Sequence, residues 1–308
     1  MVTDSIVATR GLSFAYGDIV ALSDVTLDVP QGTVGLVGAN GAGKTTLIKL
    51  LLGILPTESG TVDVLGHSVA TDRLAIRSQV GFMPEGDCMP KDQNAADFIG
   101  YAAELAGLPT RAARQRASDV LTLVGLHEER FRRMVEFSTG MMQRAKMAQA
   151  LVHDPTLVLL DEPTAGLDPE GREDMLDLIE RLHGFGISVL VSSHVLTDIE
   201  RTCDWVVMLD GGKVLRSEPI SGLSQTGVVE LELFEDPAAV GAALERGGAE
   251  VRIDGSRLLV QLTNGDPFVL IRDALVASGA GVRRLGARST SLEDIFLQEG
   301  SETEEGSV

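Results

Sequence analysis

The chain has 308 residues, of which 44% are hydrophobic, so it can bury the core of one large domain or of two. Its 26 basic and 45 acidic residues give a formal charge of −19, which disfavours nucleic acid as the main partner. The two cysteines, Cys88 and Cys203, lie far apart, which indicates a reducing compartment and argues against a disulfide scaffold or a zinc site. The N-terminus lacks the layout of a signal peptide and no apolar run approaches about 18 residues. We therefore expect no membrane span, and any role at a membrane would go through a partner protein.

The N-terminal part predicts short strands near residues 6–9 and 25–29, separated by Gly17 and Asp18. Tyr16 precedes this turn and is one of only two tyrosines in the chain. It is a candidate platform on which a nucleotide base could stack. An aromatic residue half-buried in a strand is the alternative, and it is favoured when Tyr16 is considered alone.

A glycine-rich loop lies between a strand predicted at 33–37 and a helix predicted at 45–52. It matches the phosphate-loop pattern G-x-x-x-x-G-K-[ST] in full, which predicts a nucleotide-binding site. Glycines let backbone N–H groups approach phosphate oxygens, and the helix N-terminus adds partial positive charge. Lys44 can reach the β- and γ-phosphates, and the Thr45 hydroxyl can ligate Mg²⁺. The residues of this segment predicted to contact the nucleotide are Gly38, Asn40, Gly41, Ala42, Gly43, Lys44, Thr45 and Thr46.

Further short strands are predicted at 60–65 and 80–83, and Glu85 follows the second of them. Apolar periodicity then predicts helices from about 94 to 152. A hairpin is predicted across residues 205–215, where a turn of Asp and Gly separates two apolar runs.

A small-residue turn at 137–144 interrupts the helical region and begins a new helix. Ser138 is a candidate N-cap of that helix, and Gly140 could bring backbone N–H groups close to a ligand. By itself this pattern is a weak signal, because many helices begin at a serine.

Two apolar runs end in polar residues. The run at 157–160 is closed by Asp161 and Glu162, and the run at 187–191 leads to His194. Unbroken apolar runs are typical of parallel strands covered on both faces, and open α/β sheets bind ligands at the carboxyl ends of such strands. Together with the phosphate loop, this predicts Asp161 as a residue that positions Mg²⁺ and Glu162 as one that activates water. His194 is predicted to lie at the same edge of the sheet.

These motifs resemble, in order and spacing, the nucleotide-binding subunit of an ABC transporter over residues 5–220, about two-thirds of the chain. The most family-specific stretch is FSTGMMQRAKMAQALVHDP at 137–155. The resemblance implies an α/β fold at residues 1–220: a P-loop NTPase core of ABC type with antiparallel β and helical subdomains, the helical one at about 86–152.

The resemblance also implies a role for each motif. Segments 38–45, 157–161, 165–168 and 137–141 correspond to the Walker A motif, the Walker B motif, the D-loop and the signature sequence. The individual roles are adenine stacking for Tyr16, metal binding for Thr45 and Asp161, catalysis for Lys44, Glu162 and the switch histidine His194, and ATP contact for Ser138, Gly140 and Asp168.

The chain departs from the family pattern in two places. FSTGM replaces the usual signature LSGGQ, but Ser138 and Gly140, the two positions expected to contact the γ-phosphate, are kept. Glu85 stands where the family has the Q-loop glutamine. A carboxylate there could strengthen metal ligation or repel the γ-phosphate. Our hypothesis is that Glu85 still ligates Mg²⁺ when ATP is bound.

The resemblance further implies two copies meeting head to tail, with ATP between the phosphate loop of one and the signature segment of the other. Glu162 would polarise the attacking water, His194 would contact the γ-phosphate, and Lys44 with Mg²⁺ would hold the developing charge. The expected partners are a second copy and integral-membrane permease subunits, at the cytoplasmic face of the membrane, with no nucleic acid. Export is expected from the resemblance alone. The alternative is a soluble ABC ATPase acting on the ribosome or DNA, which the single phosphate loop and the negative charge disfavour.

The C-terminal quarter predicts a separate small unit. A linker near 218–225 leads to a β-α-β-β-α-β order, which is typical of a ferredoxin-like α+β domain at 221–300. Thr290 and Glu293 could form a capping box of a last helix, and an acidic tail follows at 301–308. The segment SLEDIFL near the end resembles that of ATPase subunits of ABC-2-type exporters. We expect an appendage that stabilises a dimer, with a ligand-sensing domain as the alternative.

Overall fold

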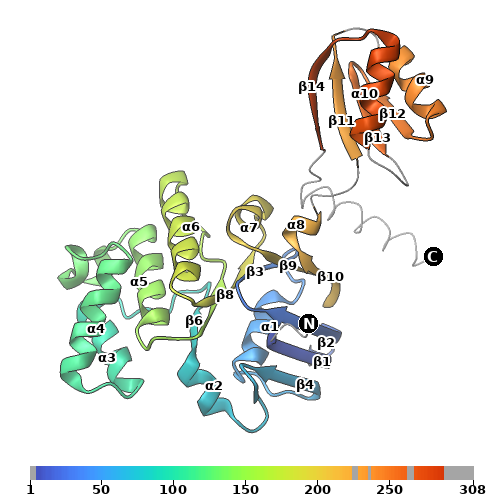
Figure 1. Cartoon of the computed structure of the whole chain (residues 1–308). Coiled ribbons are helices and arrows are strands. Elements are labelled where there is room, and N and C mark those ends of the chain that lie inside the picture. Colours follow the sequence, from blue (N-terminus) through green and yellow to red (C-terminus); the bar gives the residue numbers. More distant parts are fainter. Residues whose placement is uncertain (1–4, 224–227, 235–236, 262–266, 288–308) are drawn as a thin grey trace. The chain divides into compact units, whose positions relative to one another are not determined.

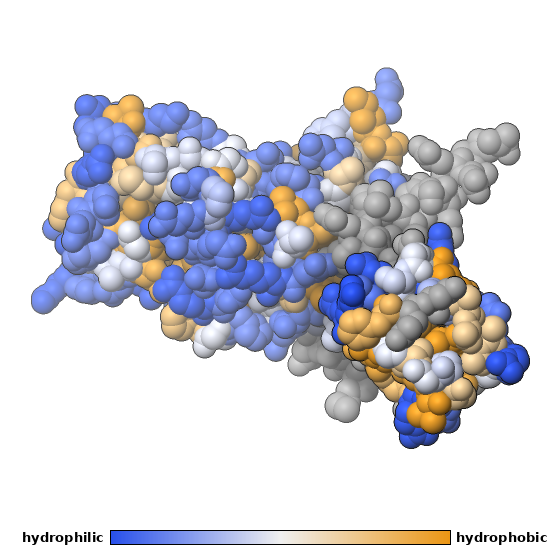
Figure 2. All heavy atoms as spheres, turned by 90° about the horizontal axis from the view of Figure 1, so that it is seen from above, coloured by the Kyte–Doolittle hydropathy of each residue, from blue (hydrophilic) through white to orange (hydrophobic). Residues whose placement is uncertain are grey.

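The computed structural model describes residues 5–223, 228–234, 237–261 and 267–287. The chain forms two compact units, Met1–Pro219 and Ile220–Val308, each of which is described by itself. The helix expected at 290–293 and the acidic tail lie outside the described residues. Among the described helices, none combines the length and the apolar character that crossing a membrane requires. In the face shown in Figure 2, hydrophilic residues predominate over the first unit.

An antiparallel sheet opens the first unit, in the order β2-β1-β4-β5. Its strands are β1 Ser5–Tyr16, β2 Ile19–Pro30, β4 Ser59–Val64 and β5 His67–Ser68. Buried and exposed residues alternate along most of β2, so one face packs on the core and the other meets solvent. The two short strands predicted before residue 30 are therefore parts of one long hairpin, which turns at Gly17 and Asp18.

The second sheet of this unit has the order β10-β9-β3-β8-β7-β6. Its strands are β3 Thr33–Val37, β6 Val80–Met83, β7 Leu157–Asp161, β8 Ser188–Ser193, β9 Trp205–Asp210 and β10 Lys213–Pro219. All neighbours pair in parallel except β9 and β10, which form an antiparallel hairpin. Every residue of β3, β7 and β8 is buried, which explains their unbroken apolar runs. The ends of these three strands therefore bring the predicted motifs to one edge of the sheet.

Helices cover this sheet and extend it into a helical subdomain, at the green end of Figure 1. The helices around the sheet are α1 Lys44–Leu51, α2 Arg73–Gln79, α6 Pro169–Gly184 and α7 Leu196–Thr202. The helical subdomain comprises α3 Ala95–Leu105, α4 Thr110–Leu123, α5 Thr139–Leu151 and the 3₁₀ turns η1 Glu129–Phe131 and η2 Met134–Glu136. A Cβ at Gly81 of β6 would lie 2.1 Å from the Ala150 carbonyl oxygen. Helix α5 therefore packs directly against the sheet.

Helix α1 is anchored in the core between the two sheets. Leu47, Ile48 and Leu51 are almost fully buried in one cluster with side chains of β1, β2, β3 and β4. Burying a side chain of this size stabilises a fold by roughly 1.5–3 kcal/mol. The apolar face of α1 therefore fixes where the helix begins, and with it the loop between β3 and α1.

The second unit has the ferredoxin-like arrangement predicted from the sequence. Its elements are α8 Ile220–Leu223, β11 Val228–Leu233, α9 Ala238–Arg246, β12 Glu250–Asp254, β13 Arg257–Gln261, α10 Pro267–Ser278 and β14 Val282–Ala287. The strands form an antiparallel sheet in the order β12-β13-β11-β14. Val229, Leu231 and Leu233 of β11 are buried in the core with residues of α9 and α10. Helix α8 occupies part of the segment predicted as a linker.

Candidate functional site

The loop at 38–45 connects the end of β3 to the start of α1. Gly43 is the N-cap of α1 and has a φ of 105°. A Cβ there would lie 2.6 Å from the Leu22 side chain and 2.7 Å from the Ala21 carbonyl oxygen. Only glycine combines this backbone conformation with such a close approach. The loop is thus held against β2 while its backbone turns into the helix.

Lys44 places its ammonium at the centre of this loop. The residue is only 7% exposed, and its Nζ donates to the carbonyl oxygen of Gly38 at 2.6 Å and to that of Ala39 at 3.3 Å. Nζ also lies 3.7 Å from Oε1 of Glu162. The charge is therefore oriented by the loop itself and faces the carboxylate predicted to activate water.

Asp161 receives two hydroxyl hydrogen bonds at the end of β7. Thr45 donates through Oγ1 to Oδ2 of Asp161 at 2.9 Å, and Ser192 of β8 donates through Oγ to Oδ1 at 2.7 Å. Asp161 is buried. Hydroxyl and carboxylate oxygens are the ligands that Mg²⁺ prefers. The adjacent oxygens of Thr45 and Asp161 thus fit a Mg²⁺ site, whereas Ser192 supports Asp161 from the other side.

Glu162 has an uncommon backbone conformation, with a φ of 51°. A non-glycine residue in this left-handed region costs roughly 1–3 kcal/mol and is found mainly where surrounding contacts hold it. Its N–H donates to Oγ of Ser192 at 3.1 Å and to the Ser192 carbonyl oxygen at 3.2 Å. Its Oε2 lies 2.9 Å from Nδ1 of His194. Ser192 thus binds Asp161 and Glu162, and His194 and Lys44 flank the Glu162 side chain.

The sequence interpretation did not assign a role to Ser192. This residue is fully buried, and it is the first hydroxyl after the apolar residues of β8. That change from apolar to polar within a buried strand was the available signal. It was overlooked because His194, two residues later, was the more conspicuous polar side chain.

One cleft of about 510 Å³ brings most of the predicted residues together. Its lining includes Tyr16, the phosphate loop, Glu85, Glu162 and His194. Tyr16 is 47% exposed and packs edge-on against Phe14, with ring centroids 5.0 Å apart. Its ring is therefore both anchored in β1 and accessible from the cleft, as a base-stacking platform requires.

Ser138, Gly140 and Asp168 lie elsewhere on the first unit. They line a separate hollow of about 410 Å³. Oγ of Ser138 accepts a hydrogen bond from the Met141 N–H at 3.2 Å, so the predicted N-cap of α5 is confirmed. Asp168 likewise caps α6 by accepting from the Gly171 N–H at 3.0 Å. The residues predicted to bind ATP are thus divided between two surfaces of one chain.

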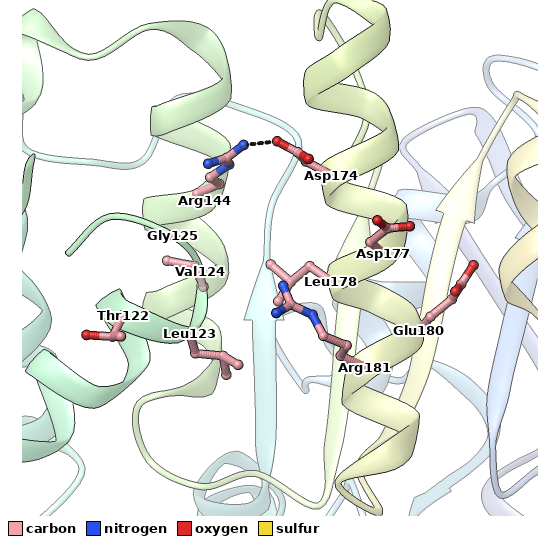
Figure 3. Close-up of a pocket in the computed structure, with 10 residues that line it drawn as sticks. All are labelled: Thr122, Leu123, Val124, Gly125, Arg144, Asp174, Asp177, Leu178, Glu180 and Arg181. Atoms are coloured by element: carbon pink, nitrogen blue, oxygen red, sulfur yellow. Dashed lines mark hydrogen bonds and ion pairs between the residues drawn. The ribbon is translucent and has the colours of Figure 1, made fainter. Parts of the chain in front are cut away.

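Helix α5 connects the second hollow to the rest of the unit. Nε2 of Gln143 donates to the Ala165 carbonyl oxygen at 3.2 Å. Arg144 forms an ion pair with Asp174 of α6, at the border of a third hollow of about 680 Å³ (Figure 3). The signature segment and the segment that leads to α6 are therefore linked by side chains that the motif analysis did not single out.

The chain is similar to known proteins over most of its length. The family model described as ABC transporter matches residues 22–165. The chain is 32% identical to the uncharacterized ABC transporter ATP-binding protein YxlF of Bacillus subtilis, with 94% of this chain and 97% of that protein covered. It is 30% identical to the daunorubicin resistance ATP-binding protein DrrA3 of Streptomyces coeruleorubidus (96% and 95% covered) and 31% identical to the Nod factor export ATP-binding protein I of Burkholderia orbicola (94% and 95%). A solved ATP-binding subunit of an ABC transporter has a TM-score of 0.65 at 28% identity, with 72% of this chain and 92% of that one covered.

The chain belongs to the ABC transporter family, as an ATP-binding subunit with the P-loop NTPase fold. Domains of this family bind and hydrolyse ATP, so the chain is an ATPase. The family resemblance and the fold class inferred from the sequence are confirmed. The roles of the individual site residues stay predictions.

Proposed function

We propose that the chain hydrolyses ATP to drive export of a substrate through a separate integral-membrane permease, as one of two copies on the cytoplasmic face of the membrane. The observation that carries this proposal is the separation of the two hollows. Tyr16, Lys44 and Glu162 lie at one, whereas Ser138 and Gly140 lie at the other. A second copy placed head to tail would complete each site, because it would bring its signature segment to the first copy's phosphate loop.

Within such a site, each side chain has a task that its surroundings support. Lys44 would bind the β- and γ-phosphates, and the Tyr16 ring would stack on the adenine. The Glu162 carboxylate would accept a proton from the attacking water, and its contact with Nδ1 of His194 would hold both side chains beside the phosphates. Thr45, Asp161 and Glu85 would hold Mg²⁺, which when bound supplies positive charge to the phosphate oxygens.

The names of two relatives support export as the direction of transport. One is a Nod factor export protein and the other a daunorubicin resistance protein. Both align with this chain over more than nine-tenths of their length, so the similarity includes the second unit as well as the ATPase unit.

We assign the permease contact to an apolar groove of about 720 Å³ in the first unit. The groove is lined by residues of α2, β6, α3 and α5 and of the loops that follow α1 and β6, among them Phe82, Pro84, Cys88, Phe98 and Leu105. Pro84 directly precedes Glu85, which lines the ATP cleft. A permease segment seated in the groove would thus touch the same loop that reaches the nucleotide.

The test is purification of tagged Glu162→Gln protein from native membranes with ATP and Mg²⁺, followed by mass spectrometry. Stoichiometric recovery of a membrane protein with several spans is the expected result, and Cys88 should then be protected from alkylation. The control is the same purification with EDTA and without nucleotide. Less of the second, untagged copy of the chain should then be recovered with the tagged protein. Recovery of ribosomal proteins or DNA-repair factors instead, with no membrane protein, would contradict the proposal.

A further inference from the structure

Helix α5 buries a lysine that no motif accounts for. Lys146 is only 4% exposed, although it carries a charge. Its Nζ donates to the Glu85 carbonyl oxygen at 2.9 Å and to the Pro84 carbonyl oxygen at 3.3 Å. Among the described residues it forms no ion pair with a carboxylate. Two neutral carbonyl oxygens of one loop are therefore the partners of a buried ammonium group.

The fold alone does not require a charge at this position. The neighbours of Lys146 along α5, Ala145, Met147 and Ala148, are buried and apolar. Removing an ammonium group from water is unfavourable unless it is hydrogen-bonded, and lysine is almost never fully buried in a core that an apolar residue could fill. A methionine could fill the same space, so the charge of Lys146 points to a role in the loop that it binds.

That loop is held by α5 at two successive points. At Gly81, β6 runs so close to α5 that a Cβ would contact the Ala150 carbonyl oxygen. Four residues later, the Lys146 ammonium holds the Glu85 backbone. Glu85 then lines the cleft that contains Lys44 and Glu162. The course of the chain from the sheet to the cleft is thus set by α5.

The charge also has an electrostatic consequence. A carboxylate that lines a triphosphate site repels the phosphates, because like charges in a partly buried site interact strongly. The Lys146 ammonium, whose Nζ lies 2.9 Å from the Glu85 carbonyl oxygen, places a positive charge next to that residue.

We propose that Lys146 is a positioning residue for ATP hydrolysis: it fixes the Pro84–Glu85 backbone so that the Glu85 carboxylate is presented to the metal in the ATP cleft. This rests on the proposed role of Glu85 as a Mg²⁺ ligand. Residues that orient a metal ligand typically change metal affinity by about 10- to 100-fold when they are removed. Because α5 also begins at Ser138, the same helix carries the signature segment.

The experiment is a double-mutant cycle on the full-length protein. The variants are Lys146→Met, Glu85→Ala and the two combined. Lys91→Met is the matched control, because Lys91 is an exposed lysine on the same segment, ion-paired with Asp87. The readouts are the Mg²⁺ concentration that gives half-maximal binding of a fluorescent ATP analogue, the same value for ATP hydrolysis, and the melting temperature.

Lys146→Met should raise the Mg²⁺ requirement about 10-fold in both assays. In the Glu85→Ala background, Lys146→Met should alter the Mg²⁺ requirement less than about 2-fold, since no carboxylate is left to position. Lys146→Met should lower the melting temperature by the same amount in both backgrounds, because the lost hydrogen bonds go to the backbone of residues 84 and 85 and do not involve the carboxylate. Should Lys146→Met fail to fold, Lys146→Leu removes the same donor with a different apolar side chain and should give the same shift in Mg²⁺ requirement.

An equal shift in both backgrounds, or no shift in the presence of Glu85, would overturn the inference. An unchanged Mg²⁺ requirement in Glu85→Ala itself would show that Glu85 is not a metal ligand, and the inference about Lys146 would fall with it. In that case the proposals on ATP hydrolysis and on the permease would be unaffected, so the two failures are distinguishable.

Discussion

Ser192→Ala is the most informative single change in the site, because one hydroxyl group forms hydrogen bonds with both Asp161 and Glu162. In the wild-type protein it donates to Oδ1 of Asp161 at 2.7 Å and accepts from the Glu162 N–H at 3.1 Å. Alanine removes both bonds without adding bulk. The Glu162 N–H keeps its second acceptor, the carbonyl oxygen of residue 192. The main loss is therefore the bond to the charged carboxylate.

The magnitude follows from that bond. A hydrogen bond to a charged group contributes about 1.5–3 kcal/mol to stability. The first unit spans Met1–Pro219. For a domain of this size, such a loss lowers the melting temperature by about 3–12 °C. Asp161 accepts side-chain hydrogen bonds from Thr45 and Ser192 among the described residues. If Thr45 turns its hydroxyl to Mg²⁺ as proposed, Asp161 has neither of these bonds in the Ser192→Ala variant. The same 1.5–3 kcal/mol would then slow hydrolysis by about 10- to 150-fold.

The assay is ATP hydrolysis at saturating ATP over a range of Mg²⁺ concentrations, together with thermal unfolding. Ser188→Ala is the control: it removes a hydroxyl at the start of the same strand, where Oγ accepts only a long bond of 3.4 Å from the Gly32 N–H. Ser188→Ala should change the rate less than about 2-fold. Equal melting temperatures and equal rates for the two variants would refute the reasoning.

Three further predictions follow from the structure. Glu162→Gln should still bind ATP but hydrolyse it at least about 10²-fold more slowly, the scale of losing a general base; near-normal turnover would remove Glu162 from that role. Burial raises the pKa of the Cys203 thiol to about 12, whereas Cys88 is exposed, so a thiol reagent at pH 8 should modify one cysteine in the folded protein and both in urea. Rapid modification of both in the folded protein would contradict this. Burial lowers the pKa of His153 below the value near 6.5 of an unfolded chain, so its contribution to stability is present above that pH and is lost as the pH falls through the folded-state pKa. His153→Gln should therefore flatten the decline of the unfolding free energy from pH 7 to pH 5, as measured by urea denaturation; an unchanged slope would exclude His153 as a contributor.

Each motif that was predicted from the sequence consists of a few consecutive residues. The phosphate loop, the strand Leu157–Asp161 and the helix Pro267–Ser278 have the positions predicted for them, because local patterns of glycine, apolar residues and polarity determine them. Helix α6 was not predicted, although Met175, Leu178, Ile179 and Leu182 follow the helical period and are buried. Its charged residues obscured that apolar stripe.

The supporting contacts of the site could not be read from the sequence in the same way. Ser192 is 31 residues from Asp161, and Lys146 is 61 residues from Glu85. Periodicity indicates which face of an element is buried, but it does not say which side chain lies opposite. These partners depend on strand order in the sheet and on where α5 packs, and both are set by the core as a whole.

The division of the predicted ATP contacts between two surfaces has a genetic consequence. In a head-to-tail pair, a copy with a defective phosphate loop (Lys44→Ala) inactivates the site that contains its own phosphate loop. A copy with a defective signature segment (Gly140→Asp) inactivates the site that contains its partner's phosphate loop. Neither variant alone can assemble an intact site. When the two are expressed together, a mixed pair combines the phosphate loop of one with the signature of the other, and one working site returns. Two loss-of-function alleles would thus complement each other in one cell through pairs with one working site, the same number that remains when either variant pairs with the wild type.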